Sequence, residues 1–114
     1  MRSIVSLLRQ SKVFTDIDVL ELVDEGTVQL LRIRAILKDS SVLHITELHT
    51  SDFQKYSYHW QKSNGDMLLR WDNAPHYKEL KTFPHHRHDG SKVLPSHRIT
   101  VDEVIEVIIT RLER

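Results

Sequence analysis

The sequence predicts an α+β domain, in which an antiparallel β-meander of about five strands carries an N-terminal and a C-terminal helix on one face. Three observations predict this fold class. Asn64-Gly65 joins two runs of alternating side chains, two more turn signals lie between runs rich in Val, Leu and Ile, and both chain ends have apolar residues at helical spacing. A chain of 114 residues suits one hydrophobic core, so residues 1–114 are expected to form a single domain.

Both ends of the chain are predicted to be helical. Residues 2–10 place Ile4, Leu7 and Leu8 at helical spacing, which predicts a short helix that needs a sheet to pack on. Near the other end, Thr100 and Glu103 have the spacing of a capping box. The helix that follows is expected to bury one apolar stripe, which consists of Val101, Val104, Ile105, Ile108 and Leu112.

Two hairpins are predicted in the first half of the sheet, with turns at Glu25-Gly26 and at Asp39-Ser40. A two-residue turn at Asp39-Ser40 places His44 opposite Ala35 on the core face, where it is interpreted as a hydrogen-bonded core histidine. The same register places Arg32 opposite Glu47 on the other face of the sheet.

The third hairpin, around Asn64-Gly65, organises the rest of the chain. This dipeptide favours a two-residue type I′ turn, whose register pairs Tyr58 with Trp71 and His59 with Arg70. The opposite face of the hairpin, with His59, Arg70 and Asp72, is expected to stay partly open. The first face carries apolar side chains that are interpreted as core, with base stacking as the alternative: Tyr56, Tyr58, Trp60, Met67, Leu69 and Trp71.

Residues 73–98 have no sustained periodicity and contain all three prolines of the chain. They are predicted to form a long loop, which in a compact domain is usually functional, flexible or bound to a partner. Of the eight histidines in the chain, five lie between His76 and His97. Any unusual chemistry of this protein is therefore expected in the hairpin and in this loop.

Composition excludes several classes of function. Sixteen basic and sixteen acidic residues cancel, so an RNA contact would need a local basic patch. The absence of cysteine excludes disulfides, thiolate zinc sites and a thiol nucleophile, and agrees with a reducing cytosol. No apolar run approaches the ~20 residues that span a bilayer, and no signal-peptide pattern is present. A cytoplasmic location without membrane contact is expected, and none of the three glycines fits a phosphate-binding loop.

The open face of the third hairpin has residue types that suit metal-free cleavage of RNA. A histidine moves a proton, a guanidinium holds a phosphate, and a carboxylate orients an imidazole. His59, Arg70 and Asp72 supply these three groups on one face. The alternative is a solvated sheet face on which these polar side chains serve only solubility.

The run of residues 84–88, Pro-His-His-Arg-His, has three interpretations. It contributes to a metal site if His76, His97, Asp72 or Asp89 completes the ligand set. With Arg87 and Lys92 nearby it forms a basic, phosphate-attracting loop, and otherwise it is a surface loop whose histidines bond to backbone and water. The sequence favours the last two interpretations, so no metal and no cofactor are predicted.

Three segments resemble the TumE-like family of small bacterial and archaeal proteins: residues 58–61 (YHWQ), residues 70–76 (RWDNAPH) and residues 82–88 (TFPHHRH). The resemblance extends over most of the chain. It implies the toxin of a type II toxin–antitoxin pair, with a cognate helix-turn-helix antitoxin as partner. RNA and a second copy of the chain are further candidate partners. No catalytic residue is implied by the resemblance.

These observations give one leading hypothesis, a toxin that acts on RNA as a metal-independent ribonuclease or an RNA-binding protein. One alternative is a non-catalytic interaction module whose open face or final helix docks a helix-turn-helix antitoxin or another partner. The other is a metal-binding hydrolase built on the histidine loop. The candidate catalytic residues are His59, Arg70, Asp72, His85 and His86. The candidate substrate-binding residues are Arg32, Arg34, Asn73, His76, Arg87 and His88.

Overall fold

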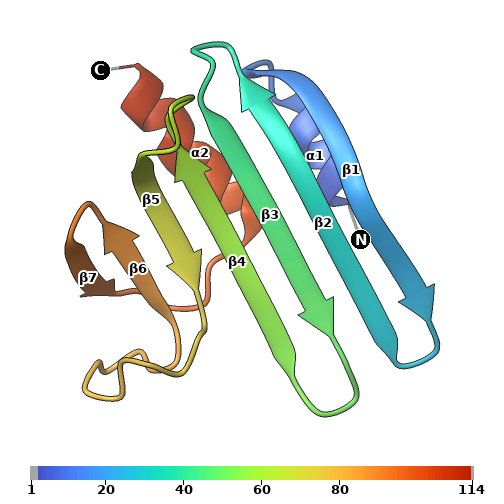
Figure 1. The fold of residues 1–114 in the computed structure, drawn as a ribbon, viewed down its shortest axis with the longest axis vertical. Helices are drawn as coiled ribbons and strands as arrows, with labels where there is room; N and C mark the ends of the chain where they lie inside the picture. The colour runs from blue at the N-terminus through green and yellow to red at the C-terminus, as the bar shows by residue number, and fades with distance from the viewer. Residues whose placement is uncertain (1–2, 114) are drawn as a thin grey trace.

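A computed structural model describes residues 3–113 as one antiparallel sheet with two helices (Figure 1). The described residues form seven strands in the spatial order β1-β2-β3-β4-β5-β6-β7, so that every strand pairs with its neighbour in sequence. The predicted meander and α+β class are confirmed, with two strands more than expected. The strands are β1 (Phe14–Glu25), β2 (Val28–Leu37), β3 (Val42–His49), β4 (Gln54–Gln61), β5 (Met67–Asp72), β6 (His86–Asp89) and β7 (Lys92–Pro95).

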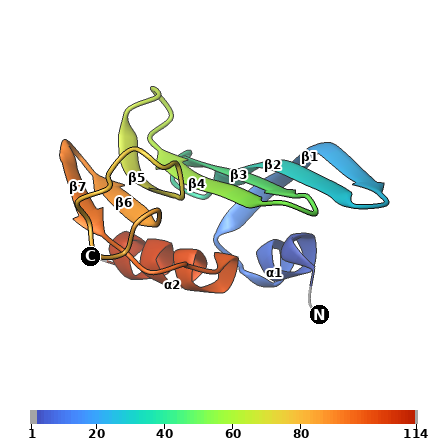
Figure 2. The same ribbon diagram turned by 90° about the horizontal axis from the view of Figure 1, so that it is seen from below.

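Both helices lie on the same side of the sheet, as Figure 2 shows. The short helix α1 spans Ile4–Gln10 and the longer α2 spans Val101–Leu112. Leu8 of α1 and four residues of α2 join the buried core, together with the apolar face of the sheet. The aromatic side chains interpreted as core are buried there, since Tyr58 and Trp71 are each 1% exposed. Neither described helix combines the length and hydropathy that a membrane crossing requires.

The predicted helix signals are confirmed over the described residues. The side chain of Thr100 accepts from the N–H of Glu103, and the Glu103 carboxylate accepts from the N–H of Thr100, so the capping box is complete. The buried residues of α2 are four of the five stripe positions, Val101, Val104, Ile105 and Ile108. The predicted N-terminal helix started at Arg2, which lies outside the described residues.

The β4–β5 hairpin has the predicted register beyond its turn. His59 lies opposite Arg70, and Tyr58 opposite Trp71. The turn itself has three residues rather than two, because Lys62 pairs with Asp66 through a 2.8 Å hydrogen bond and Gly65 has a φ of +97°. A bulge at Leu68 compensates for the extra loop residue, so the faces are as predicted from Leu69 onward. Met67, predicted on the core face, pairs instead with Gln61, and Leu68 packs against the core.

The predicted β2–β3 register is wrong by one residue. Ser40 has a φ of +71° and the Leu37 N–H donates to the Ser41 carbonyl, which makes a three-residue loop without a compensating bulge. Because a one-residue slip exchanges the faces of a strand, His44 pairs with Arg34 and lies on the open face instead of in the core. The β1–β2 turn is also displaced by one residue. It was predicted at Glu25-Gly26, but Glu25 pairs directly with Val28, so the turn residues are Gly26 and Thr27.

The predicted pairing of Arg32 with Glu47 is corrected by the same slip. Arg32 lies opposite Thr46 and forms a 2.7 Å ion pair with Glu21 of β1. Glu47 lies on the helix side of the sheet, where it accepts a hydrogen bond from the Tyr58 hydroxyl.

The predicted long loop contains a further hairpin, β6–β7, around Gly90 and Ser91. Asp89 pairs with Lys92, and Gly90 takes a φ of +61° that suits a two-residue hairpin turn. Strand β6 pairs with β5 so that His86 lies opposite Asp72 and His88 opposite Arg70. This pairing places two histidines of the loop on the open face of the sheet.

Candidate active site

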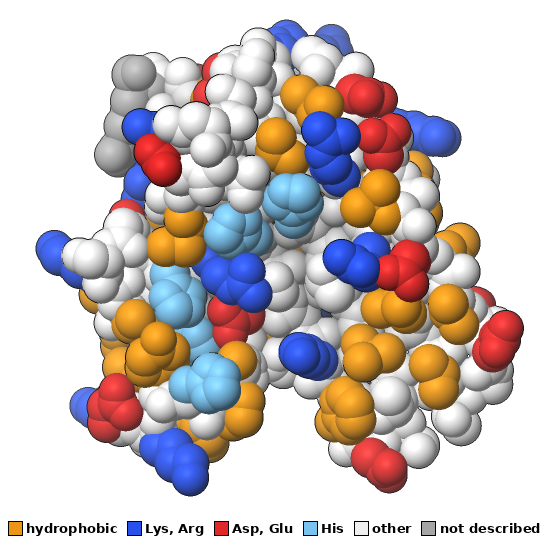
Figure 3. All heavy atoms as spheres, in the orientation of Figure 1, with side chains coloured by type: hydrophobic (Ala, Val, Ile, Leu, Met, Phe, Trp, Pro, Cys, Tyr) orange, Lys and Arg blue, Asp and Glu red, His pale blue; other side chains and the backbone are white. Residues whose placement is uncertain are grey.

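A row of polar side chains crosses the open face of the sheet from β2 to β6. Directly opposed residues in antiparallel strands point to the same face, and the successive pairings join Arg34 to His44, His44 to His59, His59 to Arg70, and Arg70 to His88. Figure 3 shows histidine side chains gathered on this face beside basic and acidic ones. The open face therefore concentrates imidazoles and guanidinium groups in a chain whose net charge is zero.

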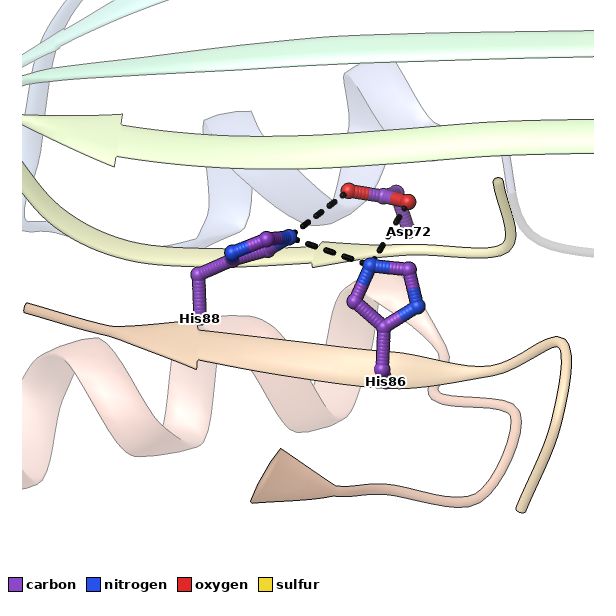
Figure 4. A group of neighbouring side chains, drawn as sticks. All are labelled: Asp72, His86 and His88. Atoms are coloured by element: carbon purple, nitrogen blue, oxygen red, sulfur yellow. Dashed lines mark hydrogen bonds and ion pairs between the residues drawn. The ribbon is translucent and has the colours of Figure 1, made fainter. Parts of the chain in front are cut away.

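The carboxylate of Asp72 is the centre of the polar contacts on this face (Figure 4). Asp72 is only 5% exposed. Its Oδ2 accepts from Nε of Arg70 at 2.9 Å and lies 3.6 Å from Nε2 of His88. Its Oδ1 accepts from the N–H of Ala74 at 2.9 Å and lies 3.1 Å from Nε2 of His86. The hydrogen bonds from Arg70 and Ala74 fix the carboxylate at the end of β5.

His86 is the most buried polar side chain of the site, at 1% exposed. Its Nδ1 lies 3.0 Å from the carbonyl oxygen of Pro84. Because a carbonyl only accepts, Nδ1 carries the proton and Nε2 points into the cluster. The Nε2 atoms of His86 and His88 are 3.0 Å apart, so Asp72, His86 and His88 form a compact group drawn together in Figure 4.

Tyr77 packs against this group from the segment that connects β5 to β6. Its ring meets the His86 ring edge-on, with centroids 4.8 Å apart, and lies 5.8 Å from the His88 ring. Tyr77 therefore shields one side of the histidine pair, whereas the His88 side chain remains 21% exposed.

His59 and Arg70 are in direct contact on the more accessible part of the row. Nη1 of Arg70 lies 3.2 Å from Nδ1 of His59. A guanidinium has no acceptor, so Nδ1 of His59 accepts and is unprotonated in this contact. Asp72 consequently orients Arg70 and lies beside the His86–His88 pair, whereas the sequence suggested that it orients His59.

The site opens into a hollow of about 310 Å³, which is lined by side chains of β1 to β5 that include Arg32, His44, His59 and Arg70. Burial lowers the pKa of His44 and of His59, and the positive charges of Arg34 and Arg70, respectively, lower them further. Burial also lowers the pKa of His88, against the opposing effect of the Asp72 charge. His44 and His59 are therefore neutral near pH 7 and offer lone pairs.

Four candidate residues lie away from this cluster. Arg87 pairs with Trp71 and so points to the helix side, and His85 hydrogen-bonds the Tyr56 hydroxyl at 3.0 Å on that same side. Asn73 joins β5 to β4, because its amide donates to the Gln54 carbonyl and accepts from the Tyr56 N–H. His76 is exposed beside that junction.

The other candidates lie on the open face. His59, Arg70, Asp72, His86 and His88 form its centre, while Arg32 and Arg34 lie at its β1–β2 side in contact with Glu21 and Asp18. Sequence reasoning missed two members, His44 and Tyr77. His44 was displaced by the register error, and no pattern in residues 73–85 distinguishes Tyr77 from other loop residues.

Comparison with known proteins gives one family. The family model described as Toxin TumE matches residues 4–114. No curated protein and no solved structure gives a significant match. The match includes every residue of the polar row and of the Asp72 cluster.

Proposed function

Because this chain belongs to the TumE toxin family, we propose that it is the toxin of a type II toxin–antitoxin pair and that it cleaves RNA in the cytoplasm. The family supports the toxin role. The proposal of RNA as target rests on one observation, the contact between His59 and Arg70 on an open face at 3.2 Å, with Asp72 holding Arg70 from behind. Phosphate binding and proton transfer are the two tasks that RNA cleavage requires.

Arg70 is placed to bind a phosphodiester. Its Nε is engaged by Asp72, which holds the guanidinium in one orientation. Its Nη1 contacts His59, and both residues line the hollow. Arginine is suited to this task because its planar fork binds two phosphate oxygens at once. Arg34 and His44, further along the row, extend the same surface for the neighbouring phosphates of a single strand.

His59 is placed to act as the general base. In the free protein its Nδ1 lone pair accepts from Arg70. A phosphate bound by Arg70 competes for that N–H and frees the lone pair to take the proton of a 2′-hydroxyl. The 2′-oxygen then attacks phosphorus, the bond to the 5′-oxygen breaks, and that oxygen takes a proton from water. The hydroxide that remains takes the proton from His59, which restores the neutral base. The products are a 2′,3′-cyclic phosphate and a 5′-hydroxyl.

The test is a set of substitutions in the full chain. His59→Ala and Arg70→Ala are each expected to abolish growth arrest on induction and cleavage of total RNA by the purified protein. Arg70→Lys is expected to be poor as well, because an ammonium keeps the charge but loses the planar two-pronged contact. His97→Ala, at an exposed position outside the row, is the matched control and keeps full activity.

Stability measurements separate chemistry from folding in this experiment. His59 and Arg70 are partly exposed, so their alanine variants are expected to keep a melting temperature near that of the parent. If both variants stay fully toxic, or if toxicity disappears only together with the fold, RNA cleavage at this face is refuted.

We further propose that the antitoxin covers the far end of the β1–β2 hairpin, which projects beyond both helices (Figure 2). Four apolar side chains are exposed along this hairpin, with Leu22 the most open at 71% and the others Val19, Leu20 and Val28. β1 is an edge strand with five acidic residues and no basic ones. Its charge complements a basic, DNA-binding antitoxin, and exposed apolar patches commonly mark protein interfaces.

A further inference from the structure

We propose that Asp72, His86 and His88 bind a divalent transition-metal cation, with Zn²⁺ as the simplest representative. One carboxylate oxygen and the two Nε2 atoms lie within 4.8 Å of one another. The inference concerns binding of the cation and does not depend on the proposed cleavage of RNA. It departs from the expectation that the histidine run holds no metal.

The distances suit three ligands of one ion. Zinc lies ~2.0–2.2 Å from nitrogen and oxygen ligands, which sets neighbouring ligand atoms roughly 3.0–3.5 Å apart. The two Nε2 atoms are separated by 3.0 Å, and Oδ1 of Asp72 lies 3.1 Å from Nε2 of His86. A small shift of the side chains is sufficient to direct all three atoms at one point.

The ring of His86 is oriented as metal-bound imidazoles usually are. A ligating histidine normally donates its second N–H to a carbonyl or carboxylate, which fixes the tautomer. Here Nδ1 of His86 donates to the Pro84 carbonyl, so the lone pair of the neutral ring is on Nε2. That lone pair faces a carboxylate oxygen and another imidazole nitrogen, and a cation between them satisfies all three groups at once.

The fold holds the three ligands without help from a metal. His86 and His88 are two residues apart on β6 and therefore point to the same face. β5 sets Asp72 directly opposite His86, and the N–H groups of Ala74 and Arg70 hold its carboxylate. Oδ2 is engaged by Arg70, and Oδ1, which also accepts from the Ala74 N–H, is the oxygen nearer to His86.

The donor set indicates which class of ion binds. Two imidazoles and one carboxylate favour zinc, nickel, copper or ferrous iron over magnesium or calcium, which prefer oxygen ligands. The partial exposure of His88 provides an entry path, and three protein ligands leave coordination positions for water or another ligand. Of the acids and histidines that the sequence suggested as completing ligands, Asp72 alone belongs to this group, since Asp89 pairs with Arg111 at 3.0 Å.

The test measures metal binding directly, on full-length protein whose affinity tag has been removed and whose metal has been stripped with a chelator. Calorimetry is expected to show one equivalent of Zn²⁺ per chain and none of Mg²⁺. Zn²⁺ is also expected to raise the melting temperature, because an ion that binds only the folded state stabilises it by mass action. Co²⁺ is expected to give visible absorption bands that Zn²⁺ displaces.

Two variants and one control decide the outcome. His88→Gln and Asp72→Asn are expected to weaken Zn²⁺ binding by roughly tenfold or more, the scale at which even outer-shell changes act. His76→Gln, an exposed histidine of the same segment, is expected to bind as the parent does. Asp72 is buried and its variant can lose the fold, so His88, on the accessible side of the group, carries the decision.

Two results overturn the proposal. One is the absence of a stoichiometric site in the parent protein. The other is equal binding by the parent, His88→Gln and His76→Gln, which marks scattered surface histidines. If the metal-stripped protein cleaves RNA, the proposed function stands whether or not the protein binds a metal. If the parent protein binds one metal and cleaves RNA, and His59→Ala does not cleave RNA, the metal site and the proposed function are both supported.

Discussion

The substitution Trp71→Ala tests whether the aromatic face of the sheet is core or an RNA-stacking surface. Trp71 is 1% exposed and lies opposite Tyr58 under the helices. A buried tryptophan removes about 150–250 Å² from water, which at about 25 cal/mol per Å² corresponds to ~4–6 kcal/mol. Because alanine retains part of that burial and the cavity relaxes only partly, a loss of ~3–5 kcal/mol in the free energy of unfolding is expected.

Urea unfolding followed by circular dichroism measures this loss as a change in midpoint at constant slope. For a domain of this size the corresponding drop in melting temperature is roughly 12–20 °C. Leu22→Ala, at a position 71% exposed, is the matched control and is expected to change stability by about 0.5 kcal/mol or less. A near-neutral Trp71→Ala that has lost RNA binding would refute the assignment of this face to the core.

Three further predictions concern the cap, the pH response and the proposed antitoxin surface. Thr100→Ala removes the capping hydrogen bond to Glu103 and is expected to cost ~1 kcal/mol in urea unfolding; no change would show that the cap is dispensable. His44 and His59 have lowered pKa values in the folded protein, chiefly through burial. As pH falls, these two side chains therefore bind protons more readily in the unfolded chain than in the folded one. Their contribution to the free energy of unfolding is present above the ordinary histidine pKa and is lost as pH falls below it. The melting temperature is therefore expected to fall from pH 7 to pH 5, and to fall less when both are replaced by Gln; an equal slope contradicts this. Leu22→Asp is expected to keep growth arrest but escape neutralisation by the antitoxin, and full neutralisation would remove the antitoxin from this surface.

The part of the site that could be predicted from the sequence is the part built by local pairing. Asn64-Gly65 marks a hairpin, and alternation along its strands assigns His59, Arg70 and Asp72 to one face. The predicted two-residue loop was wrong, but the bulge at Leu68 restored the register. The faces were thus predicted correctly from Leu69 onward, whereas Met67 and Leu68, on the turn side of the bulge, exchanged faces.

The β2–β3 hairpin shows why the same reasoning failed elsewhere. Its loop depends on a positive φ at Ser40. Serine rarely adopts this conformation, and no residue in the turn indicates it. Without an Asn-Gly signal, two-residue and three-residue loops were equally consistent with the pattern. The resulting slip moved His44 from the polar row into the predicted core.

The β6 strand was missed because it is short and polar. Its four residues are His86–Asp89, and none of them gives the apolar alternation by which strands are recognised. The usable signal was Gly90-Ser91, with Val93 and Leu94 following it. His86 and His88 reach Asp72 only through this pairing. Spacing along the chain therefore named Asp72 as one of four possible completing ligands but could not select it.

Strand β5 connects the stability of the core with the geometry of the site. Leu69 and Trp71 are buried under the helices, and Arg70 and Asp72 alternate with them on the open face. A slip of one residue would bury the guanidinium and expose the indole, so the packing of Trp71 also determines where the Asp72 carboxylate points. The residues of the site differ in how much their substitution disturbs the fold. Asp72 and His86 are buried and polar, so changing either one leaves buried polar groups without partners. His59 and His88 are partly exposed, so their variants test the chemistry with less disturbance of the fold.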